Sequence, residues 1–347
     1  MTHSFKILFL FIVVLITVVS AGRVEAATAS KQAQPKYTRI FYYRDSERAL
    51  VSFLENIKSI DVLAPQSYTF NTSGTLSGSV DPYLISVAKR HNVKLMPLVT
   101  NGNFSESSLR ALLDDPAKQD KAADALVAEA LKYGYWGWQI DFEQIRLPDR
   151  DAFSAFIDRL GKVMKEHDLV LSVAVIAQVS DIPSDYPRNL WERLIGAYDY
   201  AALASSTDFI SIMSYDDPES KGPVARYSWM KQAIAHSLKY IPSEKLSLGI
   251  PLYYWKWNET TGKLVGIGGY EGIENTLKKY KVAKSFSTKH QVPYLTYTVN
   301  KTPYIIWYEN AKSIQQKLAL ITTNELHGFS AWVLGLETPD IHNVLMR

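Results

Sequence analysis

Gly134-Tyr-Trp-Gly-Trp-Gln-Ile-Asp-Phe-Glu143 has the pattern of a buried strand that ends in two acidic residues. Because side chains alternate along a strand, Asp141 and Glu143 share one face with Gln139, whereas the opposite face is entirely apolar. Desolvated like charges repel, so this pairing should raise the pKa of one carboxyl. A carboxyl with a raised pKa is a proton donor near neutral pH. The stretch therefore predicts an active site for acid-catalysed bond cleavage.

Apolar, strand-like runs recur along the chain and alternate with segments of helical periodicity, clearest at 117–132 and 149–167. Strands that are buried on both faces and alternate with amphipathic helices indicate a parallel sheet. Eight such repeats predict a closed (β/α)₈ TIM barrel, an α/β fold, and an open doubly wound sheet is the alternative. The predicted strands are 39–43, 62–70, 94–100, 137–143, 170–177, 209–216, 246–252 and 329–335.

One interval in this pattern is too long for a single helix. Between the seventh and eighth strands, the helix of the repeat is expected at 310–323. Residues from about 253 to 305 then have no place in the barrel repeat. That remainder is rich in Tyr and Gly, so we expect a small α+β insertion before the last helix and strand. The barrel as a whole is predicted to occupy 38–347.

The amino terminus has the features of a secretory signal peptide. Lys6 precedes an apolar run at 7–19, and small residues lead to Ala26. The apolar run is shorter than the roughly 20 residues that a membrane span needs. We therefore expect cleavage near Ala26 (signal peptide 1–26), a flexible leader at 27–37, and a protein secreted or held in the cell envelope, in the periplasm or cell wall. An uncleaved anchor on a scaffold protein is the competing interpretation.

Composition narrows the class of protein. The 347 residues include no cysteine, and 47% are hydrophobic, so an exported chain must depend on a large core instead of disulfides. A formal charge of +3 without dense Lys/Arg runs argues against nucleic acid as a partner. No metal-ligand spacing and no phosphate-binding glycine loop is found, so neither a metal nor another cofactor is expected. Oligomeric state has no signal, and a monomer is the default expectation.

Barrel enzymes place their active sites at the carboxyl ends of the strands, so we compared the residues there. The fourth strand supplies two acids, the sixth a phenol and an acid, and the eighth an indole. Such a set suits the cleavage of a sugar polymer. The candidate catalytic residues are Glu143, Asp141 and Tyr215, and the candidate substrate-binding residues are Trp332, Asp216, Met213, Gln139, Tyr42, Gln178 and Tyr253.

Four of these strand ends resemble glycoside hydrolase family 18, the chitinase-like enzymes. Ile140-Asp-Phe-Glu143 is similar to the Asp-x-Glu end of that family's fourth-strand signature, and Met213-Ser-Tyr-Asp216 to its Met-x-Tyr-Asp. The segment 245–253 resembles its seventh strand, and Trp332 its strand-eight tryptophan. Further stretches resemble the bacterial branch that acts on peptidoglycan, the spore-cortex N-acetylglucosaminidase type; they are 95–101, 196–200 and 306–313.

The resemblance implies substrate-assisted retaining catalysis, in which the substrate's 2-acetamido oxygen is the nucleophile. It implies that Glu143 protonates the glycosidic oxygen and then activates water, and that Asp141 holds the acetamido N–H. It also implies that Tyr215 binds the acetamido oxygen and that Trp332 stacks beneath the sugar. The expected partner is a polysaccharide that contains N-acetylglucosamine, either peptidoglycan or a chitin-type glycan, cut at β-1,4 bonds.

The chain departs from the family pattern at three places. Trp136 stands where the signature usually opens with Asp, and Gln139 stands where Asp or Asn is common. Gln139 cannot share a proton with Asp141, although its amide can donate a hydrogen bond. Asp217 and Pro218 replace the acid and His that commonly follow the Tyr-Asp of strand six. These departures motivate the alternative function, a weakly active or inactive glycan-binding protein on the same barrel.

Overall fold

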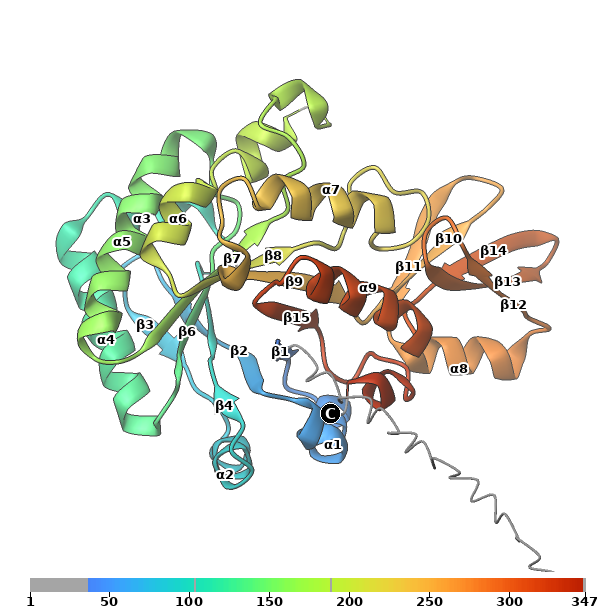
Figure 1. The fold of residues 1–347 in the computed structure, drawn as a ribbon, viewed down its shortest axis with the longest axis horizontal. Coiled ribbons are helices and arrows are strands. Elements are labelled where there is room, and N and C mark those ends of the chain that lie inside the picture. Colours follow the sequence, from blue (N-terminus) through green and yellow to red (C-terminus); the bar gives the residue numbers. More distant parts are fainter. Residues whose placement is uncertain (1–36, 103, 188, 346–347) are drawn as a thin grey trace, which may run out of the picture. The chain divides into compact units, whose positions relative to one another are not determined.

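The computed structural model describes residues 37–102, 104–187 and 189–345 (Figure 1). The predicted signal peptide and all but the last residue of the predicted leader lie outside these ranges. Within them, no helix is long and apolar enough to cross a membrane.

Eight parallel strand positions close into a barrel, as the sequence predicts. The first strand pairs with both the second and the last, which makes an open doubly wound sheet impossible. The third position is split in two at Met96-Pro97, because proline cannot donate a ladder hydrogen bond. The barrel strands are β1 Thr38–Tyr43, β2 Val62–Phe70, β4 Lys94–Leu95 with β5 Leu98–Thr100, β6 Gly137–Asp141, β7 Val170–Ile176, β8 Phe209–Met213, β9 Leu246–Pro251 and β15 Gly328–Trp332.

Helices follow most barrel strands, and one short antiparallel strand, β3 Leu76–Gly78, extends β2. The helix before β6 shows how local sequence sets these bounds: Asp115 caps its start and Gly134, in the left-handed conformation, ends it. The helices outside the insertion are α1 Glu47–Asn56, α2 Pro82–Arg90, α3 Glu106–Leu113, α4 Pro116–Tyr133, α5 Arg150–Glu166, α6 Tyr200–Ser206, α7 Tyr227–Ser237 and α9 Ala311–Thr323.

The insertion is a five-stranded antiparallel sheet with one helix, drawn at the right of Figure 1. Its strands are β10 Tyr254–Asn258, β11 Lys263–Gly268, β12 Ala283–Ser287, β13 Val292–Val299 and β14 Thr302–Trp307, and its helix is α8 Tyr270–Lys279. The sheet therefore ends two residues beyond the range expected from sequence. Trp257 connects it to the barrel through a hydrogen bond from its indole N–H to the Gly222 carbonyl, 2.7 Å.

Packing behind β6 determines which way its acids point. Phe142 is fully buried outside the barrel and stacks on Phe156 of α5, with ring centroids 6.1 Å apart. Burying a phenylalanine of this kind is worth about 1.5–3 kcal/mol. Because Phe142 is held on the outer side, its neighbours Asp141 and Glu143 are directed to the inner side, as the alternation in the sequence predicts.

Candidate active site

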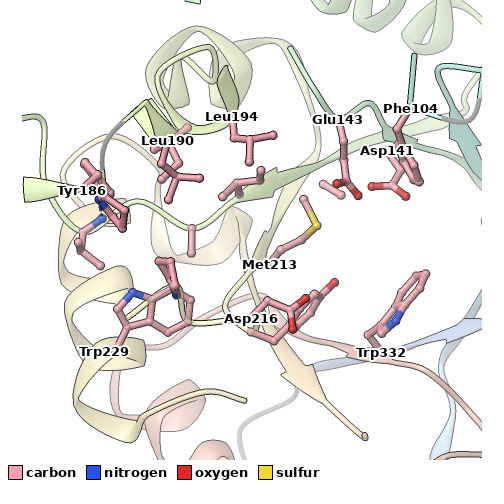
Figure 2. A pocket seen from close by; sticks show the side chains of 18 of the residues that line it. Phe104, Asp141, Glu143, Tyr186, Leu190, Leu194, Met213, Asp216, Trp229 and Trp332 are labelled. Atoms are coloured by element: carbon pink, nitrogen blue, oxygen red, sulfur yellow. Dashed lines mark hydrogen bonds between the residues drawn. The ribbon is translucent and has the colours of Figure 1, made fainter. Parts of the chain in front are cut away.

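Asp141 and Glu143 lie together at the carboxyl end of the barrel and line one cavity of about 490 Å³ (Figure 2). This volume is typical of a small-molecule binding site. Asp141 is the last residue of β6 and is 4% exposed. The strand expected from the sequence, 137–143, is two residues too long. β6 ends at Asp141, and Glu143 lies beyond it and is only partly buried. Glu143 therefore stands on the loop, where it is the more accessible of the two carboxyls.

The environment of the two carboxyls favours their protonated forms. Burial raises the pKa of Asp141 well above its usual range, and the negative charge of Glu143 raises it further. Gln66 of β2, which hydrogen-bonds to Asp141, opposes that rise in the pKa. Burial also raises the pKa of Glu143, and the charge of Asp216 adds to the effect. The pair thus retains a proton to higher pH than isolated carboxyl groups do, as a general acid requires.

Two side chains outside β6 hold the backbone on which Glu143 stands. Asn101, 1% exposed at the end of β5, donates from Nδ2 to the Glu143 carbonyl oxygen, 2.9 Å. Its Oδ1 accepts from the Glu143 N–H, 3.0 Å. The Tyr198 hydroxyl donates to the Phe142 carbonyl oxygen, 2.8 Å. Neither residue was a sequence candidate, although both stand in stretches that resemble the bacterial enzymes acting on peptidoglycan.

Tyr215 and Asp216 follow β8 and also line the cavity, together with Met213. Burial raises the pKa of the Tyr215 phenol well above its usual value, so the hydroxyl remains a hydrogen-bond donor. Asp216 adopts a positive φ of 55°, an uncommon conformation for a non-glycine residue. Tyr253, by contrast, does not line the cavity. Its hydroxyl donates a hydrogen bond to Asp216 Oδ1, 2.5 Å, and so holds the Asp216 carboxylate in place.

Trp332 and Tyr42 form the aromatic side of the cavity near the carboxylates. Trp332 ends β15, and its ring centroid lies 5.3 Å from that of Tyr42 of β1. Tyr42 is 1% exposed, and burial together with the charge of Asp141 raises the pKa of its phenol. A tryptophan at this end of the cavity offers a flat apolar surface of the kind on which a sugar ring stacks.

Besides Tyr253, two other predicted substrate contacts do not lie at the cavity. Gln139 is fully buried below Asp141, where its Nε2 donates to Ser172 and Ser211 at 2.9 and 2.8 Å. Its Oε1 is buried without a hydrogen-bond partner among the described residues. Gln178 is also buried, and its Nε2 donates to the Ile195 and Tyr198 carbonyl oxygens, 3.0 Å each. Strand parity gives the face of the sheet but not the depth in the barrel, which is why Gln139 lies away from the cavity. Gln178 lies two residues beyond the end of β7, where the course of the loop directs its side chain.

The cavity has further lining residues that sequence reasoning missed. Charged and polar examples are Arg44, which follows β1, and Gln66. Aromatic examples are Phe104, from the loop after β5, and Trp229 of α7, and the strand pattern predicts the position of neither. Across the described residues, no group of three or more His, Cys, Asp or Glu side chains could hold a metal ion.

With a closed barrel, paired carboxylates and an adjacent tyrosine and tryptophan in one cavity, the molecule has the architecture of a glycosidase. The chain belongs to family 18 of the glycosyl hydrolases, whose model matches residues 37–337. The chain is therefore a glycosidase, and the resemblance found in the sequence is confirmed.

Curated relatives and solved structures agree with this assignment. The uncharacterized glycosylase YvbX of Bacillus subtilis is 27% identical over 297 residues, which cover 83% of this chain and 84% of YvbX. The cortical fragment-lytic enzyme of the same organism is 28% identical over 284 residues, and the match covers 79% of this chain and 64% of that enzyme. This chain therefore spans less than two thirds of the length of that enzyme.

The structure of the spore cortex-lytic enzyme SleL of Bacillus megaterium superposes with a TM-score of 0.79 at 25% identity, covering 90% of this chain and 74% of SleL. A chitinase from Chromobacterium violaceum has the same TM-score at 24% identity, covering 89% of this chain and 98% of the chitinase, and shows the shared fold.

Proposed function

We propose that the protein is an exported glycosidase that cleaves β-1,4 bonds next to N-acetylglucosamine by substrate-assisted, retaining catalysis. The observation that carries the proposal is the meeting of Asp141, Glu143, Tyr215 and Trp332 around one cavity. Two acids alone would fit many hydrolases. The added phenol and indole match what a 2-acetamido sugar requires, namely a donor for its acetamido oxygen and a flat surface for its ring.

In the proposed reaction Glu143 donates its proton to the glycosidic oxygen as the bond to C1 breaks. The substrate's acetamido oxygen attacks C1 as the leaving group departs, which gives a cyclic intermediate. Water then attacks C1 and opens that intermediate, and the two displacements together retain the configuration. Asp141 accepts a hydrogen bond from the acetamido N–H, while Tyr215 donates to the acetamido oxygen. Glu143, now deprotonated, takes a proton from the attacking water. The raised pKa of Glu143 supports the first step, because it keeps the acid protonated toward neutral pH.

Peptidoglycan is the substrate that we favour, and chitin-type glycans are the alternative. The names of the cortical fragment-lytic enzyme and SleL point to the spore cortex, whereas other relatives are named chitinases. The test is release of reducing ends from purified peptidoglycan and from chitin oligosaccharides by the wild type and by Glu143→Gln. Glu166→Gln, at the exposed end of α5, is the matched control. Cleavage that Glu143→Gln abolishes and Glu166→Gln retains supports the proposal.

A glycan-binding protein without hydrolytic activity is the second candidate, and Gln139 is the observation that favours it. An amide at that buried position cannot exchange a proton with Asp141. Trp136 gives the idea less support, because it lies away from the cavity, where it stacks on Phe209 with centroids 6.3 Å apart. If the wild type and Glu143→Gln bind one polymer equally and neither cleaves it, the binding protein is the better description.

Export is proposed from the apolar amino-terminal run and the small residues that precede Ala27. We propose a secreted or envelope location, with no membrane attachment after cleavage and a monomeric mature protein. Sequencing the amino terminus of the protein from its native cells tests the point. A mature start near Ala27 supports export, and retention of residues 1–26 contradicts it.

A further inference from the structure

The positive charge of the protein is concentrated in the insertion. The segment 254–307 contains eight lysines and three glutamates, with neither arginine nor aspartate, so its formal charge is +5, whereas that of the whole chain is +3. Four of the eight lysines fall within seven residues, at the end of α8 and along β12; they are Lys278, Lys279, Lys281 and Lys284. The net charge of the whole chain conceals this local concentration.

The fold brings these lysines to one side of the insertion sheet. α8 lies along that side, where its Ile273 shares a buried cluster with Leu295 of β13 (Figure 1). Lys284 is directly opposite Leu295 in the antiparallel ladder, so its side chain is on the same face of the sheet. Lys312 of α9 adds a further cation there, because its Nζ lies 3.8 Å from the ring centroid of Phe286, two residues along β12 from Lys284. We call this surface the lysine face and define it by five exposed residues, Lys278, Lys279, Lys281, Lys284 and Lys312.

The charge of the lysine face is not neutralised within the protein. Glu271, at the other end of α8, pairs instead with Arg48 of α1 at 3.0 Å. In the part of the chain that the structure describes, no ion pair joins a carboxylate to a lysine of this face. Grouped like charges repel each other in the free protein, and a bound polyanion relieves that repulsion.

Protection of an exposed sheet edge explains one of these lysines only. β12 is an edge strand of the insertion sheet, and a lysine on such a strand discourages pairing with another chain. Lys284 suits that purpose. The three lysines that precede it in the sequence lie in α8 or between α8 and β12, outside every strand, so they need another explanation.

The chemistry of the lysine face favours a polymer with repeated anionic groups. A single exposed ion pair is weak and is screened by salt, so an isolated carboxylate would gain little from this surface. A polymer engages several lysines at once, and its weak contacts then act together. Each ammonium group stands on a flexible stem and tolerates irregular spacing of the anions. Peptidoglycan has such groups, the carboxylates of its peptide branches, whereas chitin is uncharged.

We propose that the lysine face binds the carboxylates of the peptide branches of peptidoglycan and so retains the enzyme on the polymer between cleavages. The inference rests on the proposed function for the identity of the polymer. None of the five lysines lines the cavity, so the face acts on binding of the polymer and not on the bond-breaking step. A short neutral oligosaccharide gains nothing from it.

The test measures sedimentation of the protein with purified peptidoglycan from which phosphate-containing polymers have been removed. Glu143→Gln is the parent protein, because it leaves the polymer intact during the assay. Adding Lys278→Gln, Lys279→Gln, Lys281→Gln and Lys284→Gln gives the lysine-face variant. The control variant instead adds four substitutions of exposed lysines elsewhere and has the same net charge: Lys58→Gln, Lys89→Gln, Lys165→Gln and Lys239→Gln. Thermal unfolding establishes that both variants fold.

We expect the lysine-face variant to bind peptidoglycan about 10-fold more weakly than the parent at low salt, while the control variant binds like the parent. Added salt should weaken binding of the parent more than that of the lysine-face variant. Amidation of the peptidoglycan carboxylates should remove the difference between the two proteins. Equal binding by the lysine-face and control variants overturns the inference. A difference that survives amidation, or that appears only when phosphate-containing polymers are left in place, also overturns it.

Failure of this inference and failure of the proposed function give different results. If the wild type cleaves neither peptidoglycan nor chitin oligosaccharides, the proposed function fails, and carboxylate-dependent binding through the lysine face still supports the inference. If the wild type cleaves peptidoglycan and the lysine-face variant binds it as tightly as the control variant does, the inference fails and the proposed function stands.

Discussion

The side-chain amide of Asn101 forms two hydrogen bonds with the backbone of Glu143, one to its carbonyl oxygen at 2.9 Å and one from its N–H at 3.0 Å. β5 and β6 pair up to Thr100 and Asp141, so the ladder stops just before these residues. Beyond that point the side chain of Asn101, and not a backbone strand, forms hydrogen bonds with the backbone of Glu143. Glu143, the proposed general acid, can therefore leave the sheet and line the cavity while hydrogen bonds fix its backbone.

We expect Asn101→Ala to lower kcat by about 10- to 100-fold with a much smaller change in KM, because small displacements of a catalytic group are that costly. Loss of the amide also leaves two backbone groups unpaired, which costs about 1–3 kcal/mol of stability. Steady-state kinetics and thermal unfolding measure the two effects. Asn324→Ala, which removes an asparagine bond to the Leu320 carbonyl at the end of α9, is the control. A stability loss with unchanged kcat would show that Asn101 is only structural.

Asp141 should make the folded protein less stable as the pH rises. Burial raises its pKa above the value of about 3.9 in an unfolded chain. A carboxyl with a raised folded pKa imposes no penalty below the unfolded value, and the penalty grows as the pH climbs toward the folded value. Asp141→Asn removes it, so the Tm of the variant minus that of the wild type should increase between about pH 4 and pH 8.

Differential scanning calorimetry at several pH values measures this difference, at roughly 1.5 °C per kcal/mol for a protein of this length. Asp151→Asn, exposed on α5, is the matched control. Parallel Tm curves for the wild type and Asp141→Asn would contradict the assigned burial penalty. The same variant should be nearly inactive, which would make Asp141 a residue that costs stability for the sake of function.

Lys317 and Glu309 form a fully buried ion pair, with Nζ and Oε2 2.7 Å apart, between α9 and the segment that follows β14. Lys317→Met leaves the Glu309 carboxylate buried without its cation, and we expect a loss of about 3–5 kcal/mol. The double variant Lys317→Met/Glu309→Gln should recover part of that loss. Urea unfolding measures both. If the double variant is as unstable as the single one, the unpaired charge is not the cause.

The order of the barrel strands and the inward direction of the two acids were predictable, because both follow from local alternation of apolar and polar residues. Depth in the barrel was not predictable: Gln139 shares the face of Asp141 but lies below the cavity, where it binds Ser172 of β7 and Ser211 of β8, 33 and 72 residues away in the chain. The role of Asn101 was also hidden, since its partner is 42 residues away in the chain. The cavity wall that Leu190 and Leu194 form depends on the course of the loop after β7, which contacts such as the hydrogen bonds of Gln178 to the Ile195 and Tyr198 carbonyl oxygens set.

The central claim is that Glu143 and Asp141 catalyse cleavage with the substrate's own acetamido group as the nucleophile. The most direct test is proton NMR of the products in the first minutes of chitin-oligosaccharide cleavage, before the anomers equilibrate. We predict that the new reducing end appears first as the β-anomer, because two displacements at C1 retain configuration. Initial release of the α-anomer would mean a single displacement by water, and would contradict the mechanism.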